Sequence, residues 1–302
     1  MENDLNTLAL ALYVTTDDYL NTHPELLPAR PASGYQPRIS DCELIVLGVM
    51  ESLLRYTSER HFLRHAHTHL TGMFPHIPQQ PGYNKRQRNL TRVIQHVMVH
   101  LATSSGLLDD DVWIVDSTPV ECGRSRETVK RSDLAGTAEY GYCASHSRFF
   151  WGMRLHLVST LHGMPVGYAV TGAKADERHT LLSMLDTVPV PVPDGQVIIA
   201  DKGYNGAWLE DDLADGGVQL IRPARKGEAP RPGRQFLKPL RQRIESVFDT
   251  LKGQLTLEQH GGRTVPGVAS RLLRRLLALT AAIWHNHNIG QPVLRSLIAY
   301  DH

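Results

Sequence analysis

The sequence predicts an α/β protein with two domains: an all-helical domain over residues 1–106, and a domain over residues 107–302 with a mixed five-stranded sheet flanked by helices. Two short apolar runs, residues 112–115 and 197–200, have the composition of strands that are buried on both faces of a sheet. Strands and helices alternate around these runs, whereas the residues before them repeat apolar side chains at helical spacing.

Length and composition indicate a globular protein. The chain has 302 residues and a formal net charge of +1, with 41% hydrophobic and 21% charged residues. Its apolar runs are shorter than the ~18 residues of a membrane span, and the N-terminus lacks the pattern of a signal peptide. The three cysteines are odd in number and lack the spacing of a zinc site. We therefore expect a cytoplasmic protein that does not contact a membrane.

Three helices are predicted in the helical domain after residue 39. Ser40 and Glu43 form the pattern of a capping box before the first helix. The second helix covers residues 58–70 and the third residues 84–105. Basic residues occupy the opening turns of the third helix: Lys85, Arg86, Arg88 and Arg92. Because a helix dipole disfavours cations at the N-terminus, these residues predict either an anionic ligand or an ordinary exposed face.

The second domain is predicted to contain five strands and four helices. The strands are residues 112–116, 149–160, 165–172, 197–201 and 218–222. One helix begins after Asp176 as its N-cap, and the others cover residues 207–214, 236–255 and 268–286. Pro119 lacks an N–H group, so the first strand is expected to end close to Asp116. Residues 121–148 are expected to form a long, irregular polar segment.

One economical topology accommodates this order of elements. The first three strands form an antiparallel meander, and the fourth and fifth join in parallel through right-handed helical crossovers. If the fourth strand pairs beside the first, the order of strands in the sheet is 3-2-1-4-5. Asp116 and Asp201 then lie at neighbouring carboxyl ends, where open α/β sheets place their binding sites.

A third acid is expected from the helix at residues 236–255. Arg241, Glu245 and Lys252 lie on a common flank of this helix, beside its apolar stripe. Glu245 is therefore the expected third acid, and Asp249, one turn further on, is the competing candidate. Arg241 and Glu245 also have the spacing of an ordinary exposed ion pair.

Three converging carboxylates without Cys or His partners favour hard cations such as Mg²⁺ or Mn²⁺. Two such ions about 4 Å apart support an in-line phosphoryl displacement. Residues 222–275 contain 13 Lys and Arg against 4 Asp and Glu, which suits a polyanionic partner. The alternative for this basic stretch is a solvated, Arg-rich helical face.

These motifs resemble the D-D-E motifs of bacterial insertion-sequence transposases, and most closely the 982 family of insertion sequences. The three acids stand in recognisable contexts: Val115-Asp116-Ser117, Ala200-Asp201-Lys202-Gly203-Tyr204, and Arg241, Glu245 and Lys252 at the spacing of the family. Three further stretches resemble the sequences of that family, namely residues 58–62, 141–145 and 150–156. The resemblance covers nearly the whole chain from about Leu44.

The resemblance implies an RNase H-like catalytic domain over residues 107–302, preceded by a helical DNA-binding domain over residues 1–106. It also implies cut-and-paste transposition, with two Mg²⁺ ions, or Mn²⁺ in their place, held by Asp116, Asp201 and Glu245. Water and then a freed 3′-hydroxyl would act as nucleophiles. The implied partners are double-stranded DNA, as terminal inverted repeats and target, and a second copy of the chain in a synaptic homodimer at the nucleoid.

The resemblance and the basic character of the chain assign eight residues to DNA contacts. They are Arg241, Lys252, Tyr204, Lys202, Lys238, Lys85, Arg86 and Arg88. Arg241 and Lys252 would contact DNA near the scissile phosphate, and Tyr204 would stack on a base. Relatives with a Y-R-E-K signature carry Tyr where this chain has Lys238, so the stacking role of that Tyr is not carried over. The short interval from Asp201 to Glu245 leaves no room for a large inserted β-domain.

Three other hypotheses fit parts of the sequence. An RNase H-like nuclease would hydrolyse DNA at the same acids without strand transfer. A DNA-binding protein descended from a transposase would no longer catalyse, although the intact set of acids argues against this. In an unrelated α/β enzyme, Asp116 and Asp201 would be helix caps only.

Overall fold

The computed structural model describes residues 4–29, 33, 36–143, 147–188, 190–293, 297 and 300. The chain forms two compact units: the first contains Met1–Ser104 and Thr250–His302, and the second Ser105–Asp249. Residues 144 and 145 of one motif cited above lie outside the described residues. Since the residues from Thr250 onward pack with the N-terminal helices, the functional division at residue 106 stays a prediction.

The first unit is helical. Its α-helices are α1 (Leu5–Thr22), α2 (Asp41–Leu53), α3 (Glu59–His69), α4 (Gln80–Asn89), α5 (Thr91–Ser104) and α10 (Val265–Asn288). Short helical turns add Pro24–Leu26, Thr250–Gln254 and Leu257–Gln259. Helix α10 packs against α1, α2, α4 and α5, and its own residues are buried along almost its whole length. The predicted capping box before α2 is confirmed: Ser40 Oγ accepts from the Glu43 N–H, and the Glu43 carboxylate accepts from the Ser40 N–H.

The prediction of one helix over residues 84–105 was wrong, because α4 ends at Asn89 and α5 begins at Thr91. Arg86 and Arg88 therefore lie in the last turn of α4, where the helix dipole favours cations. Arg86 also donates to the Ile39 carbonyl at 3.0 Å and pairs with Asp41 at 2.5 Å. For Lys85, Arg86 and Arg88 the unfavourable placement that suggested an anionic ligand does not exist in the structure, whereas Arg92 lies in the first turn of α5.

A buried network of charges joins three helices of the first unit. Arg274 of α10 pairs with Glu51 of α2 and, at 3.2 Å, with Glu59 of α3. The Tyr83 hydroxyl donates to Glu51 at 2.7 Å, and Arg271 pairs with Glu59 at 2.8 Å. Each buried carboxylate thus has a cation and a further donor, which is the condition for a charge to be tolerated inside a protein.

The second unit is built on one mixed sheet. Its strands are β1 (Val112–Gly123), β2 (Glu139–Cys143), β3 (Arg148–Thr160), β4 (Pro165–Gly172), β5 (Val197–Ile199) and β6 (Gln219–Ile221). β3 pairs antiparallel with β1, β2 and β4, whereas β5 pairs in parallel with β1 and β6. The sheet therefore has six strands among the described residues where the sequence predicted five.

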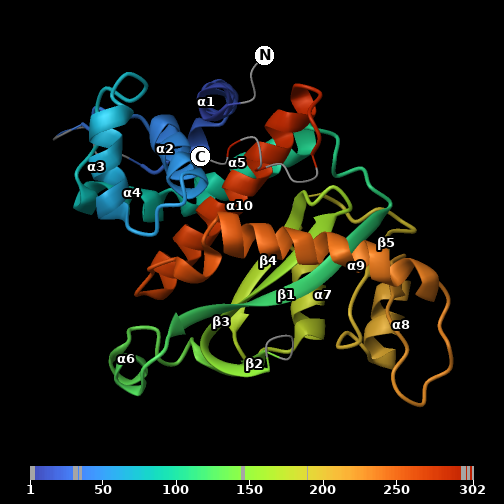
Figure 1. Ribbon diagram of the computed structural model, residues 1–302. Helices are drawn as coiled ribbons and strands as arrows, with labels where there is room; N and C mark the ends of the chain where they lie inside the picture. The colour runs from blue at the N-terminus through green and yellow to red at the C-terminus, as the bar shows by residue number, and fades with distance from the viewer. Residues whose placement is uncertain are drawn as a thin grey trace. The chain divides into compact units, whose positions relative to one another are not determined.

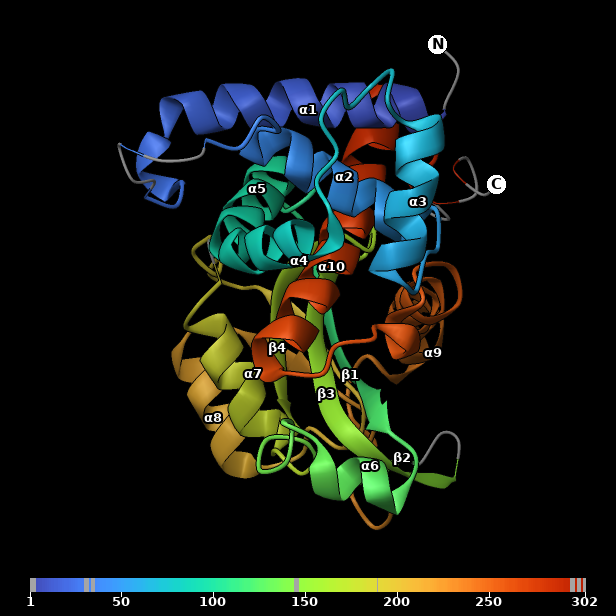
Figure 2. The same cartoon turned by 90° about the vertical axis from the view of Figure 1, so that its left-hand side faces the viewer.

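Helices cover both faces of this sheet. They are α6 (Arg126–Arg131), α7 (Glu177–Leu185), α8 (Ala207–Asp215) and α9 (Arg234–Asp249). Helix α9 packs on β1 and β5, α7 on β3 and β4, and α8 on β6. Helices α7 and α8 lie on one side of the strands and α9 on the other (Figures 1 and 2). A mixed sheet between helices is compatible with an RNase H-like fold.

Two strand predictions were wrong around residues 116–148. β1 continues through Pro119 to Gly123. Beyond Ile114 only one edge of β1 is paired, and a strand with an open edge tolerates proline. The segment expected to be irregular contains α6 and β2 instead.

His156 of β3 gives a prediction about stability in acid. The side chain is fully buried, and burial, with a smaller contribution from Arg154, lowers its pKa to about 4. As the pH falls from about 6.5 to 4, the unfolded chain takes up a proton that the folded chain excludes, so stability falls by up to about 3 kcal/mol. The free energy of unfolding in urea at pH 7, 6 and 5 should fall more steeply for wild type than for His156→Gln; parallel curves would contradict the prediction.

Candidate catalytic site

Asp116 lies in β1 just beyond the part of the strand that pairs with β5. The pairing ends at Ile114 and Ile199, so the β1 backbone has an open edge at Asp116. The side chain is half-buried, and its Oδ1 accepts from the Ser117 N–H at 2.7 Å. This position follows from the apolar run at residues 112–115, which fixes the strand inside the sheet.

Asp201 lies two residues after the end of β5, the parallel neighbour of β1. Its Oδ1 accepts from the Gly203 N–H at 2.6 Å, which closes a tight turn. The pKa of Asp116 rises to about 7, chiefly because burial disfavours its charge and also because Asp201 and Glu177 repel it; the Ser117 amide and Arg241 oppose the rise. The two predicted aspartates thus lie close enough for their charges to interact.

Glu177 is an acid of this site that the sequence analysis missed. It occupies the first turn of α7, where the helix dipole favours a negative charge. Its Oε1 accepts from Ser117 Oγ at 2.5 Å and from Arg154 Nη1 at 2.7 Å, and Arg154 Nη1 also donates to Ser117 Oγ at 2.8 Å. These bonds connect α7 to β3 and to the residue that follows Asp116.

The register of β1 against β3, which the sequence alone does not give, brings this cluster together. Ser117 lies opposite His156, which makes Arg154 its diagonal neighbour on the same face of the sheet. Arg154 belongs to one of the motifs that supported the family resemblance, and Asp176 was identified as the N-cap in front of Glu177. Without the register, nothing in the sequence connected these residues.

Gly203 lies where Asp201 and Glu177 approach each other. A Cβ atom on residue 203 would lie 2.8 Å from Asp201 Oδ1 and 3.3 Å from Glu177 Oε2. Two carboxylates therefore face the same small space next to the backbone of this turn. A side chain at residue 203 would displace at least one of them.

Tyr204 is fully buried, and its hydroxyl has no hydrogen-bond partner within the described part of the chain. Burial raises its pKa well above the usual value, and the negative charges of Glu177, Asp116 and Asp201 raise it further. The hydroxyl is therefore close to the acids, whereas the ring is closed to solvent. Stacking of Tyr204 on a DNA base stays a prediction, and it requires the turn at residues 201–206 to open.

Helix α9 places Arg241 near enough to Asp116 for the positive charge of the guanidinium to lower the pKa of that carboxyl group. Glu245, one turn further on, is 57% exposed, and its Oε1 lies 3.9 Å from Arg241 Nη2. Asp249 is the last residue of α9 and is also exposed. The helix that was expected to extend to residue 255 gives way at Thr250 to a π-helical turn that contains Lys252. The expected common flank therefore applies to Arg241 and Glu245 alone.

The donor set matches a hard cation only in part. The carboxylates of Asp116 and Asp201 are oxygen donors of the kind that such a cation prefers, and a cation would offset the repulsion that contributes to the raised pKa of Asp116. Among the described residues, however, no three His, Cys, Asp or Glu side chains come close enough to hold a metal ion together. Mg²⁺ commonly takes only one or two carboxylates and completes its shell with water and substrate phosphates.

Much of the basic stretch at residues 222–275 serves the fold. Arg222 and Arg231 form a network with Glu210 and Glu228, and Arg274 and Arg275 are buried in α10. Four of the predicted DNA contacts are exposed: Lys202, Lys238, Lys85 and Arg88. The structure thus leaves fewer cations for a polyanion than the sequence count indicated.

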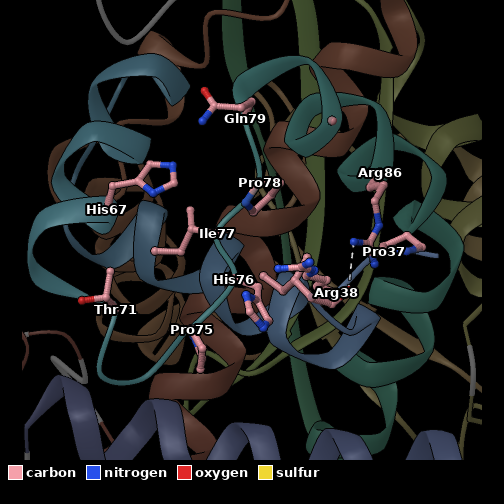
Figure 3. Close-up of a pocket in the computed structure, with 12 residues that line it drawn as sticks. Pro37, Arg38, His67, Thr71, Pro75, His76, Ile77, Pro78, Gln79 and Arg86 are labelled. Atoms are coloured by element: carbon pink, nitrogen blue, oxygen red, sulfur yellow. Dashed lines mark hydrogen bonds between the residues drawn. The ribbon is translucent and has the colours of Figure 1, made fainter. Parts of the chain in front are cut away.

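A cavity of about 550 Å³ lies in the first unit between α3, α4 and the residues before α2. Arg38, His67, His76 and Arg86 contribute basic groups to its lining (Figure 3). The figure shows Arg86 bonded within the lining itself, consistent with its bond to the Ile39 carbonyl. Because Asp41 also neutralises Arg86, the cavity is less basic than its composition indicates.

Fold and site together define a class: α/β proteins whose mixed sheet brings two aspartates together just beyond the paired part of two adjacent parallel strands. A family model described as the transposase DDE domain matches residues 107–281, more than half of the chain. The chain belongs to this family of transposase DDE domain proteins. Its membership of the 982 family in particular stays a prediction.

A Burkholderia cepacia protein, provisionally described as the transposase for insertion sequence element IS402, is 27% identical to the chain over 84 residues. This match spans 26% of the chain and 40% of the relative, so the chain covers less than half of that protein. No solved structure gives a significant match. Within the described residues, no helix is long and apolar enough to span a membrane.

Proposed function

We propose that this protein is a DNA transposase that cuts an insertion sequence at its ends and joins the freed ends to target DNA. The proposal rests on the proximity of Asp116 and Asp201, just beyond the paired part of β1 and β5, in a chain of the transposase DDE family. Two carboxylates whose charges repel each other are costly to bury, which favours a cationic ligand at this place.

The side chains of the site have separate roles in this proposal. Asp116 and Asp201 hold Mg²⁺ or Mn²⁺, with Glu245 as the third protein ligand. Arg241, which lies close to Asp116, contacts the reacting phosphate, and the exposed Lys202 and Lys238 bind neighbouring phosphates. When bound, two divalent ions activate the nucleophile and stabilise the departing oxygen.

The reaction comprises two phosphoryl transfers. In the first, a water oxygen attacks the phosphorus at the element end, the P–O3′ bond breaks, and a 3′-hydroxyl is released. In the second, this hydroxyl loses its proton and attacks a phosphate of the target, so that one phosphodiester bond forms as another breaks. Both transfers need the DNA held in line with the acids, a task for which α9 supplies its cations.

Three observations bear on the competing hypotheses. Asp116 lies inside a strand, and α8, the helix after Asp201, has Gly206 as its N-cap, so neither aspartate is a helix cap. The presence of all three acids supports a catalytic protein over a DNA-binding relic. A nuclease without strand transfer uses the same site, so only a joining assay separates that function from transposition.

Cleavage and joining by acid variants test the proposal. The substrate is a labelled duplex made from the DNA segments that border this gene, with Mg²⁺ in the reaction. Wild type should cut and join it, whereas Glu245→Gln should bind with equal affinity and cut at least ~10²-fold more slowly, because a ligand of the ions is lost. Asp249→Asn is the matched control on the same helix and should retain activity.

The outcomes separate the hypotheses. Equal cutting by wild type and Glu245→Gln would make Glu245 structural, and loss of activity in Asp249→Asn would move the third ligand to that residue. Cutting without joining would show a nuclease. Binding without cutting would show a DNA-binding relic, and the proposed function would be wrong.

A further inference from the structure

The hairpin formed by β2 and the start of β3 has two unlike faces. On one face, Cys143 and Phe150 are buried in a cluster with Ala173. Gly141 lies on the same face, where a Cβ atom would lie 2.8 Å from the Ala173 Cβ and 2.9 Å from the Phe150 ring. This face is therefore tightly packed, which fixes the direction of the alternate side chains.

The opposite face presents three aromatic rings to solvent: Tyr140, Tyr142 and Phe149 are 52%, 49% and 77% exposed. Tyr142 and Phe149 lie opposite each other on the paired strands, with ring centroids 5.0 Å apart. We refer to these three residues as the aromatic face. Single exposed apolar residues are ordinary, but three adjacent rings on a well-packed hairpin mark an interaction surface.

Helix α6 follows β1, at the end of the sheet to which β2 belongs (Figures 1 and 2). A Cβ atom on Gly123 would lie 3.2 Å from Thr128 of α6 and 3.2 Å from the ring of Trp151, so α6 is close to Trp151. Trp151 lies two residues after Phe149 in β3 and therefore on the same face of the hairpin.

Helix α6 and the two residues before it carry four exposed cations: Arg124, Arg126, Lys130 and Arg131. Lys130 and Arg131 lie 3.7 Å and 3.6 Å from Glu127, and Arg124 lies 3.4 Å from Glu121. These four cations outnumber the two acids beside them, so the neighbourhood of the aromatic face keeps an excess of positive charge.

We propose that the aromatic face binds DNA by stacking on bases exposed outside the double helix, while the cations of α6 contact the adjacent phosphates. Aromatic rings next to exposed cations are the two components of a surface for unpaired nucleic acid. A protein partner with an apolar surface would use the rings but not the cations. This inference rests on the proposed function in one respect, namely that DNA is the substrate.

The sheet indicates where along the DNA this contact falls. Leu157 pairs with Asp116 in the register of β3, and Phe149 lies at the start of the same strand. At ~3.3 Å per residue, the eight residue steps from Phe149 to Leu157 span at most about 26 Å. With a rise of ~3.4 Å per base pair, the stacked bases lie within about eight base pairs of the reacting phosphate.

Fluorescence anisotropy with full-length protein in EDTA tests this inference. The probes are a labelled 20-nucleotide single strand of oligothymidylate and a labelled 20-base-pair duplex. Phe149→Ala should weaken binding to the single strand about tenfold or more, as expected for the loss of one stacked base, and should change binding to the duplex less than threefold. Phe236→Ala, which removes an exposed aromatic ring from α9, is the matched control and should bind as wild type does.

If wild type binds the single strand well and Phe149→Ala binds it equally well, the inference is wrong. The proposed function still stands in that case, provided that wild type cuts the element ends. If sedimentation shows that wild type is a dimer and Phe149→Ala a monomer, while both bind DNA with equal affinity, the aromatic face binds a second copy of the chain instead. Failure of wild type to bind the single strand would also overturn the inference, and cleavage of the element-end duplex would decide the proposed function separately. Combined Lys130→Gln and Arg131→Gln should reduce the salt dependence of single-strand binding, and an unchanged slope would contradict the role of α6.

Discussion

Asp116→Asn is expected to reduce DNA cleavage at least ~10³-fold and, at the same time, to stabilise the metal-free protein. Activity is lost because an amide is a far weaker ligand for Mg²⁺ than a carboxylate. Stability rises because the substitution removes a charge that burial disfavours and that Asp201 and Glu177 repel. The amide oxygen of the new side chain would still accept the Ser117 N–H, so the local backbone keeps its hydrogen bond.

The two effects are measured separately. Cleavage of the labelled end duplex gives the first, and the Tm in EDTA at pH 8 gives the second, with an expected rise of roughly 2–5 °C. Asp211→Asn is the control, because Asp211 is exposed on α8 and its substitution should alter neither quantity. A variant that loses activity together with several degrees of Tm would show that Asp116 serves the fold and not the chemistry.

The combination of effects is informative because, at a cation-binding site, a carboxylate that is needed for activity lowers the stability of the cation-free protein. A carboxylate kept for structure stabilises the folded chain, whereas a carboxylate kept to bind a cation destabilises it until the cation arrives. The Glu177 bonds to Ser117 and Arg154 add a further constraint, because they hold the acid in place against the repulsion from Asp116. The site thus shows the local conflict expected where function is selected.

The strands β1 and β5, next to the two aspartates, could be predicted because short apolar runs rich in β-branched residues are typical of buried strands. The turn at residues 161–164 between β3 and β4 could be predicted because Gly163, with a φ of 81°, occupies a conformation that favours glycine. Helix α7 could be predicted from its N-cap, Asp176, whose carboxylate accepts from the Arg178 N–H. In each case the determining interactions lie within a few residues of one another.

The parts that could not be predicted depend on residues far apart in the sequence. Pro119 ended the predicted strand, yet β1 continues because β5 leaves that edge open. The Ser117–Arg154–Glu177 cluster joins three elements whose contact depends on the register of β3. The π-helical turn that contains Lys252 replaces regular helix, although residues 240–252 contain no Gly or Pro to mark the change. Sequence periodicity carries no information on any of these.

In the first unit, Arg274→Met is expected to lower the free energy of unfolding by about 3–5 kcal/mol. The substitution keeps the volume of the side chain but leaves Glu51 without a cation and Glu59 with Arg271 alone, both inside the helical core. The Tyr83 hydroxyl would remain as the partner of Glu51, which is insufficient for a buried carboxylate.

Urea unfolding measures the loss, and hydrogen exchange of peptides from α2 and α10 assigns it to the first unit. Arg88→Met, an exposed Arg on α4, is the matched control and should change stability by less than about 0.5 kcal/mol. Adding Glu51→Gln to Arg274→Met should restore part of the loss, because the unpaired charge is removed with its partner. If the double variant is no more stable than Arg274→Met, the cost comes from packing, and the charge network is not what holds α2 against α10.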